Sequence, residues 1–194
     1  NLETGEILSE DEYPKDITVE TFDIKDAARD PQLGKSIPSS QDIAQIKRMP
    51  KYMSVYFVRE DDKIKEIILP IYGKGLWSTM YGFIALGADL QTIEGFTFYE
   101  HGETPGLGGE VDNPRWKKSW QGKQAFGDNW NVKIEVIKGR VDPSGDQAKY
   151  HIDGLSGSTL TTHNKHNLVK FWLGENGYRP FLKNLQEELT HDKI

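Results

Sequence analysis

The chain has 194 residues, which is room for one domain with a full hydrophobic core, whereas two domains would each be small. It contains no cysteine, which excludes disulfides, thiolate nucleophiles and cysteine-ligated iron–sulfur clusters within the chain. The net charge is −6, and residues 1–30 hold ten acidic against three basic residues. The remainder is nearly neutral and has no clustered basic stretch, so we do not expect nucleic-acid binding.

Hydrophobicity sets a second limit. No run approaches the roughly 18 to 20 apolar residues that cross a bilayer, and no signal peptide is visible. Because 28% of the residues are charged, we expect the chain as given to be soluble and globular. It begins at Asn1 without an initiator Met, as a processed form or a fragment would.

The first 50 residues form an acidic lead-in followed by a connector. Scattered apolar residues in 1–30 predict a short helix and an edge strand laid on the domain, and a solvated, weakly packed lead-in explains them equally well. Prolines and glycine in 31–50 indicate loops, with one turn of helix at Gln41–Lys47. We therefore expect this segment to pack on a domain that spans residues 51–194.

The middle of the chain reads as strands joined by turns. Residues 55–58 and 64–69 flank an acidic turn at 60–62, which predicts a hairpin. Residues 72–86 are a glycine-flanked turn that leads into an apolar strand, and 92–99 alternate as another strand.

Residues 101–110 contain four glycines and one proline, so we expect a loop rather than a helix or a central strand. Such loops hold ligands against a rigid scaffold, although a multi-turn connector would have the same composition.

The last third predicts mainly helices. Asn113 and Pro114 start a short amphipathic helix with two core tryptophans, Trp116 and Trp120. Further expected elements are strands at 132–138 and 150–152, a helix that follows Thr161 and ends at Gly174, and a final amphipathic helix through residues 181–189. Strands grouped before helices predict an α+β domain with an antiparallel or mixed sheet packed against helices.

The stretch 153–162 carries more hydroxyl groups than a helix start needs. One side-chain oxygen satisfies an unpaired amide there, so most of these hydroxyls are left for another purpose. They belong to Ser156, Ser158, Thr159, Thr161 and Thr162.

Three other chemistries are weaker interpretations of these motifs. Residues 154–158 resemble a hydrolase nucleophile elbow, but Ser158 stands where the final glycine belongs. His163 and His166 are three apart on a predicted helix, yet no third ligand is evident nearby in the sequence, so surface histidines are the simpler interpretation. No phosphate-binding glycine motif follows a strand, which argues against independent NAD or ATP binding.

Three motifs together resemble the FMN-binding domain family, in which FMN is joined to a threonine through its phosphate. The family includes the C subunit of the sodium-translocating NADH:quinone oxidoreductase and the G subunit of the Rnf complex. The resemblance covers roughly residues 70–165. It rests on Asp153-x-x-Ser156-Gly157-Ser158-Thr159-x-Thr161, Gly73-x-Gly75-Leu76-Trp77-Ser78 and Glu103-Thr104-Pro105-Gly106-Leu107-Gly108. The family usually has Ala at the position of Ser158.

The resemblance implies a site and its cofactor. Thr161 would bear FMN as a covalent phosphoester, transferred from FAD by a separate flavin transferase with AMP leaving. The phosphate would lie at Ser156, Gly157, Ser158, Thr159 and Leu160. The flavin ring would lie against the loop that contains Glu103, Thr104, Gly106, Leu107 and Gly108, with Trp77 nearby.

The resemblance also implies a cellular setting. Members carry one N-terminal membrane helix, with the domain on the periplasmic side of the inner membrane. They relay electrons within a multi-subunit complex that oxidises NADH, reduces quinone and exports sodium. Two alternatives remain open, namely an Rnf-type electron-transport subunit and a non-redox ligand- or peptide-binding module on the same fold.

Overall fold

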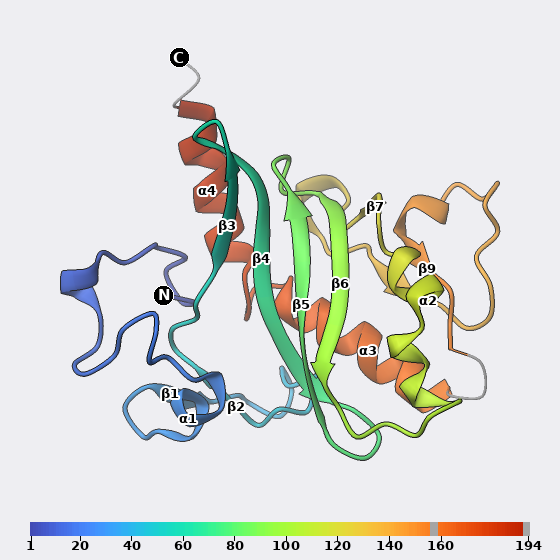
Figure 1. Ribbon diagram of the computed structural model, residues 1–194, viewed down its shortest axis with the longest axis horizontal. Helices are drawn as coiled ribbons and strands as arrows, with labels where there is room; N and C mark the ends of the chain where they lie inside the picture. The colour runs from blue at the N-terminus through green and yellow to red at the C-terminus, as the bar shows by residue number, and fades with distance from the viewer. Residues whose placement is uncertain (156–158, 192–194) are drawn as a thin grey trace.

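The computed structural model describes residues 1–155 and 159–191, and for residues 159–163 it describes the backbone alone. In this part of the chain, five strands form one antiparallel sheet in the order β3-β4-β5-β6-β7. Helix α3 (Thr159–Trp172) crosses behind the sheet, and α4 (Arg179–His191) runs beside β3 (Figure 1). The strands are β3 (Tyr56–Glu60), β4 (Lys63–Lys74), β5 (Thr79–Gly87), β6 (Thr92–Glu100) and β7 (Lys123–Gln124). The predicted α+β class is confirmed.

The predicted hairpin at 55–69 is present as β3 and β4. Asp61 and Asp62 both have positive φ, at 48° and 62°. Asp tolerates this left-handed conformation better than most residues, and two such residues in succession match the twist of the flanking strands. The acidic turn therefore sets the register in which Glu60 lies opposite Lys63, and a bulge between Val58 and Arg59 shifts it by one residue, so that Tyr56 lies opposite Ile68.

Shorter elements connect and flank the sheet. The N-terminal ones are η1 (Glu10–Glu12), α1 (Ile24–Arg29), β1 (Gly34–Ser36) and β2 (Arg48–Pro50). The later ones are η2 (Gly108–Asp112), α2 (Pro114–Lys118), η3 (Asp128–Trp130), β8 (Glu135–Val136), η4 (Ala148–Tyr150) and β9 (His151–Ile152). Strands β8 and β9 pair in parallel. As expected, Asn113 caps α2, and Trp116 and Trp120 are buried.

Three local predictions were wrong. Residues 1–30, all of which are described, contain η1 and α1 and no strand. Residues 41–47 form turns instead of a helical turn, because Asp42 accepts hydrogen bonds from the amides of Ile46 and Lys47. The strand expected at 132–138 is only Glu135–Val136, where it pairs with β9, and Val132 forms no more than an isolated bridge to Phe126.

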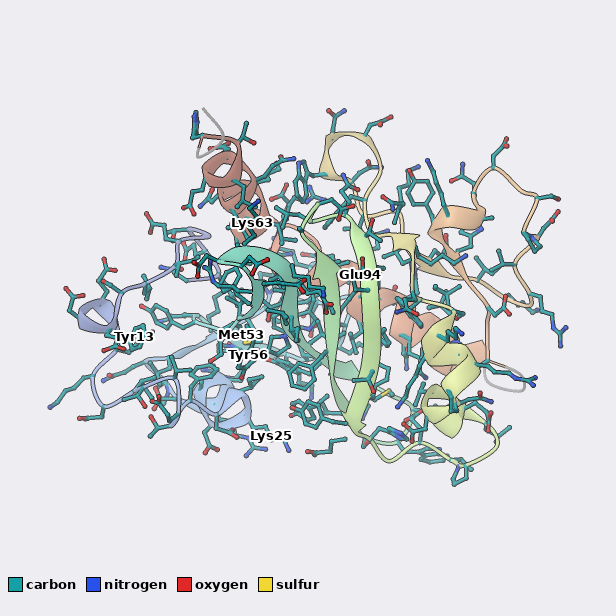
Figure 2. The ribbon with its side chains drawn as sticks, turned by 45° about the horizontal axis from the view of Figure 1, so that its top comes forward. Tyr13, Lys25, Met53, Tyr56, Lys63 and Glu94 are labelled. Atoms are coloured by element: carbon teal, nitrogen blue, oxygen red, sulfur yellow. The ribbon has the colours of Figure 1, made fainter. Side chains whose placement is uncertain are left out.

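The N-terminal segment lies against the sheet. The Lys25 ammonium group on α1 is 2.8 Å from the Glu100 carboxylate at the end of β6, and it also lies over the Tyr81 ring. Ring contacts run from Tyr81 through Tyr99 and Phe83 to Tyr56, so Lys25 and Tyr56, both labelled in Figure 2, lie on one face of the sheet. Within the described residues, no helix is both long and apolar enough to cross a membrane.

Helix α3 packs closely on β4. A Cβ atom at Gly73 would lie 2.9 Å from Leu168 Cδ1, so glycine is needed at this approach. The Trp172 indole N–H donates to the Tyr72 carbonyl at 2.6 Å. These contacts fix the position of α3 along the strand.

Replacing Tyr178 with phenylalanine tests a buried polar contact of this core. The Tyr178 hydroxyl donates to the Pro70 carbonyl at 2.6 Å, and the side chain is fully buried. The variant leaves that carbonyl without its donor, so we expect the free energy of unfolding to fall by about 1–2 kcal/mol in urea titrations. Tyr56→Phe is the control, because Tyr56 is 46% exposed, and we expect a change within about 0.5 kcal/mol. Equal losses of unfolding free energy in Tyr178→Phe and Tyr56→Phe would contradict a stabilising role for the Tyr178–Pro70 hydrogen bond.

Candidate functional site

Two loops that are distant in sequence meet at one end of the sheet. One joins β4 to β5 and contains Trp77, and the other follows β6 and contains Glu103. The amides of Leu76 and Trp77 donate to Glu103 Oε1 at 2.8 and 3.2 Å. In the opposite direction, the Gly102 amide donates to Ser78 Oγ at 2.7 Å. Glu103 and Ser78 therefore hold the two loops together.

Sheet order explains this meeting. Strand β5 lies between β4 and β6 and is antiparallel to both, so β4 and β6 run in the same direction and finish at the same end of the sheet (Figure 1). Glu103 is 6% exposed, which shows that its carboxylate faces the protein interior and organises the Trp77 loop.

Helix α3 joins this assembly near its first residues. Asn164 Nδ2 donates to the Gly75 carbonyl at 3.3 Å. The backbone of Thr159, Leu160 and Thr161 forms the first turn of α3, while Ser156, Gly157 and Ser158 lie outside the described residues. All three motifs found in the sequence thus lead to the same end of the sheet.

The segment that leads into α3 is held from two sides. Asp153 Oδ1 accepts from the Val141 amide at 2.7 Å, and the Asp153 carbonyl accepts from the indole of Trp116 at 2.9 Å. Asp153 therefore closes a turn and anchors the approach to α3 against α2.

A hollow of about 680 Å³ opens beside this approach. It is bounded by Gly106 from the loop after β6 and by Asp153, Gly154 and Leu155. Its lining also includes three basic residues, Arg115, Lys138 and Arg140, which outnumber the two acidic ones, Glu110 and Asp153. A flat ligand with an anionic group fits this combination of open volume, glycine backbone and positive charge.

The glycine-rich loop has a defined internal structure. Gly106 has φ of 76°, and an added Cβ would meet nothing within 4 Å, so the space above it is open. The Thr104 carbonyl accepts from the amides of Leu107 and Gly109. The prediction of a loop throughout 101–110 was wrong at its end, because Gly108 begins the 3-10 helix η2 through 3-10 hydrogen bonds such as Glu110 N to Leu107 O.

Large apolar side chains remain exposed around these loops. Trp77 is 68% exposed, Leu107 45% and Leu76 41%. Such side chains on neighbouring loops are typical of a surface that contacts a ligand or a partner.

Sequence reasoning missed Lys165 on α3. Its side chain is fully buried, and burial lowers its pKa to about 8, while the charge of Glu103 acts in the opposite direction. Its burial could have been inferred from the sequence, because Lys165 precedes the core residue Leu168 by three positions and so lies on the same side of the helix.

The competing chemistries gain no support. The five-stranded sheet is antiparallel, whereas a nucleophile elbow belongs to a parallel α/β-hydrolase sheet. Ser156, the residue at that elbow position, lies outside the described residues. Among the side chains that the structure describes, no three His, Cys, Asp or Glu residues gather as metal ligands.

Comparison with known proteins identifies the same region. The FMN-binding domain family matches residues 75–174, a little over half of the chain. This match includes the Trp77 loop, the glycine-rich loop and most of α3.

Individual relatives extend the likeness beyond that region. The C subunit of the Na(+)-translocating NADH-quinone reductase of Pseudomonas aeruginosa is 51% identical over 86% of this chain and 64% of its own length. Its counterpart of the same name in Yersinia pestis is 46% identical over 96% of this chain and 67% of its own length. The chain thus spans about two thirds of these curated relatives. The crystal structure of NqrC from Shewanella oneidensis matches with a TM-score of 0.85 and 36% identity, over 96% of this chain and 82% of that one.

Proposed function

Because the chain belongs to the FMN-binding domain family, and within it to the C subunits of Na(+)-translocating NADH-quinone reductases, we propose that it is an electron-carrying flavoprotein subunit. The observation that carries this proposal is the convergence of the three sequence motifs at one end of the sheet. Glu103 joins two of them, and Asn164, three residues beyond the third motif on α3, donates to the Gly75 carbonyl.

The residues at this end of the sheet fit an FMN group. An anionic phosphate is stabilised by the amides and the dipole at the start of a helix such as α3, and by Arg115, Lys138 and Arg140 in the adjoining hollow. The open space above Gly106 admits a planar ring, and Trp77 and Leu107 supply apolar surface to cover it. When bound, FMN supplies the redox chemistry, and the chain supplies binding and orientation.

We further propose that attachment occurs at Thr161. Its hydroxyl oxygen forms a bond to the FMN phosphorus of FAD, the P–O bond to AMP breaks, and the hydroxyl proton leaves. Because threonine has no activated hydroxyl of its own, a flavin transferase carries out this step. The proposed binding residues are those of the three motifs, namely Ser156, Gly157, Ser158, Thr159, Leu160, Glu103, Thr104, Gly106, Leu107, Gly108 and Trp77.

The activity of the whole complex belongs to several subunits. We propose that this chain relays electrons on the path from NADH to quinone, coupled to sodium export, without an NADH site of its own. An N-terminal helix would anchor it, with the domain, residues 51–194, on the periplasmic side of the inner membrane and residues 1–50 packed against that domain.

Coexpression with a flavin transferase tests the proposal. We expect yellow protein whose intact mass exceeds the sequence mass by one FMN phosphoester, and peptide mapping should locate the flavin within 153–165. Protein made without the transferase is the control and should lack the mass gain. A colourless chain of unmodified mass after coexpression with an active transferase would refute the flavin function and favour a non-redox binding module.

A further inference from the structure

Two charged side chains are buried among the residues whose burial the structure describes, namely Glu103 and Lys165. Glu103 is 6% exposed and Lys165 is fully buried. They come from different elements, the loop after β6 and helix α3, and the charge of Glu103 acts on Lys165. The two side chains therefore belong to the glycine-rich loop and to the helix that carries Thr161.

Stability alone does not account for such a pair. Removing an ammonium and a carboxylate from water is unfavourable, and replacing both with apolar residues of similar volume often leaves a protein as stable or makes it more stable. Glu103 Oε2 is buried and has no hydrogen-bond partner among the described residues. Buried ionisable groups with perturbed pKa values are concentrated at functional sites, where they adjust the electrostatic potential.

The position of the pair links it to the proposed flavin site. Lys165 follows Thr161 by four residues in α3, so the two positions lie one helical turn apart on the same side. Glu103 lies below the Trp77 loop, whose amides it binds. Neither side chain is among the residues that line the hollow, so either charge would act on a ring held between the loops and α3 through the protein interior, where water screens it weakly.

We infer that Lys165 is a potential-setting residue of the flavin site, whose ammonium group raises the reduction potential of FMN attached at Thr161 while the Glu103 carboxylate lowers it. This inference rests on the proposed flavin function. The state with two electrons and one proton added carries one more negative charge than the oxidised state, so a nearby cation favours it. The pair thereby places the potential between the values that either charge alone would produce.

Spectroelectrochemical titration of the flavinylated chain tests the inference. In Lys165→Met we expect the ratio of reduced to oxidised flavin at a fixed applied potential to fall about tenfold, which is a decrease of about 30 mV for a two-electron couple. In Glu103→Gln, which keeps an oxygen for the Leu76 and Trp77 amides, we expect a shift of the opposite sign. Lys165→Arg keeps the positive charge, so its reduction potential should stay near the wild-type value. The variant that combines Lys165→Met with Glu103→Gln should also return toward the wild-type reduction potential.

Lys170→Met is the matched control, because Lys170 is exposed on the same helix and loses the same charge. Potentials of Lys165→Met and Glu103→Gln that shift in the same direction, or no more than that of Lys170→Met, would overturn the inference. Intact mass, measured first, separates this result from failure of the flavin function, since a chain that takes up no FMN overturns both.

A second readout needs no flavin. NMR titration of the Lys165 ammonium signal in the unloaded chain should show a lower pKa in Glu103→Gln than in the wild type, because the opposing carboxylate is gone. An unchanged Lys165 pKa would show that the two side chains do not interact and would also overturn the inference.

Discussion

Replacing Thr161 with alanine is expected to abolish flavin attachment completely. The variant coexpressed with a flavin transferase should be colourless and have the mass of the unmodified chain, because the oxygen that bonds to the FMN phosphorus is missing. Thr161→Ser, which keeps a hydroxyl at the same backbone position in the first turn of α3, should retain the mass gain. Intact-mass spectrometry measures both variants directly.

Neighbouring hydroxyls provide the controls for this prediction. Thr159→Ala and Thr162→Ala remove the other threonine hydroxyls of the stretch and should still gain one FMN. A mass gain that survives in Thr161→Ala but disappears in Thr159→Ala would move the acceptor to Thr159 and leave the flavin function intact. Circular dichroism of Thr161→Ala should match the wild type, which would exclude unfolding as the cause.

The second large effect is a pH-dependent change in stability caused by Lys165. Its pKa is about 8 in the folded chain, mainly because of burial, and about 10.4 when unfolded. Between these values the unfolded chain binds one proton more than the folded chain, so stability rises as the pH increases. We expect Lys165 to contribute about 3 kcal/mol of stability on raising the pH from 7 to 10.5, at 1.36 kcal/mol per pKa unit.

The measurement compares wild type with Lys165→Met in urea titrations at several pH values. The free energy of unfolding of the wild type should rise relative to that of the methionine variant through the window from pH 8 to 10.5. Lys165→Met also leaves the buried Glu103 without its opposing charge, so the change of the difference with pH, and not its sign at pH 7, tests the prediction. Burial raises the pKa of Tyr72 and of Tyr178, which destabilises the folded state above pH 10, but both chains share this effect and it cancels in the difference. For the control Lys170→Met, we expect the difference in unfolding free energy from the wild type to stay constant between pH 8 and 10.5. The same constant difference for Lys165→Met would contradict the prediction.

Local patterns were sufficient for most elements. The hairpin at 55–69, the Asn113-capped helix and the helices after residue 159 follow from side-chain period, turn residues and caps, which act over a few residues. The errors arose where a local pattern depended on a distant partner. The alternation at 132–138 forms a strand only where β9 pairs with it, and the turn at 41–47 is shaped by the Asp42 carboxylate.

The surplus of hydroxyls at 153–162, the glycine-rich loop and the family to which these motifs point can be recognised from short contiguous patterns of residues. The folded arrangement was needed to reveal that Glu103 and Ser78 join two loops and that Lys165 is buried beneath the same assembly. These contacts depend on the antiparallel order of β4, β5 and β6, which brings residues distant in the chain to one end of the sheet. A lysine on a helix is usually solvated, and only packing of α3 against the sheet removes this one from water.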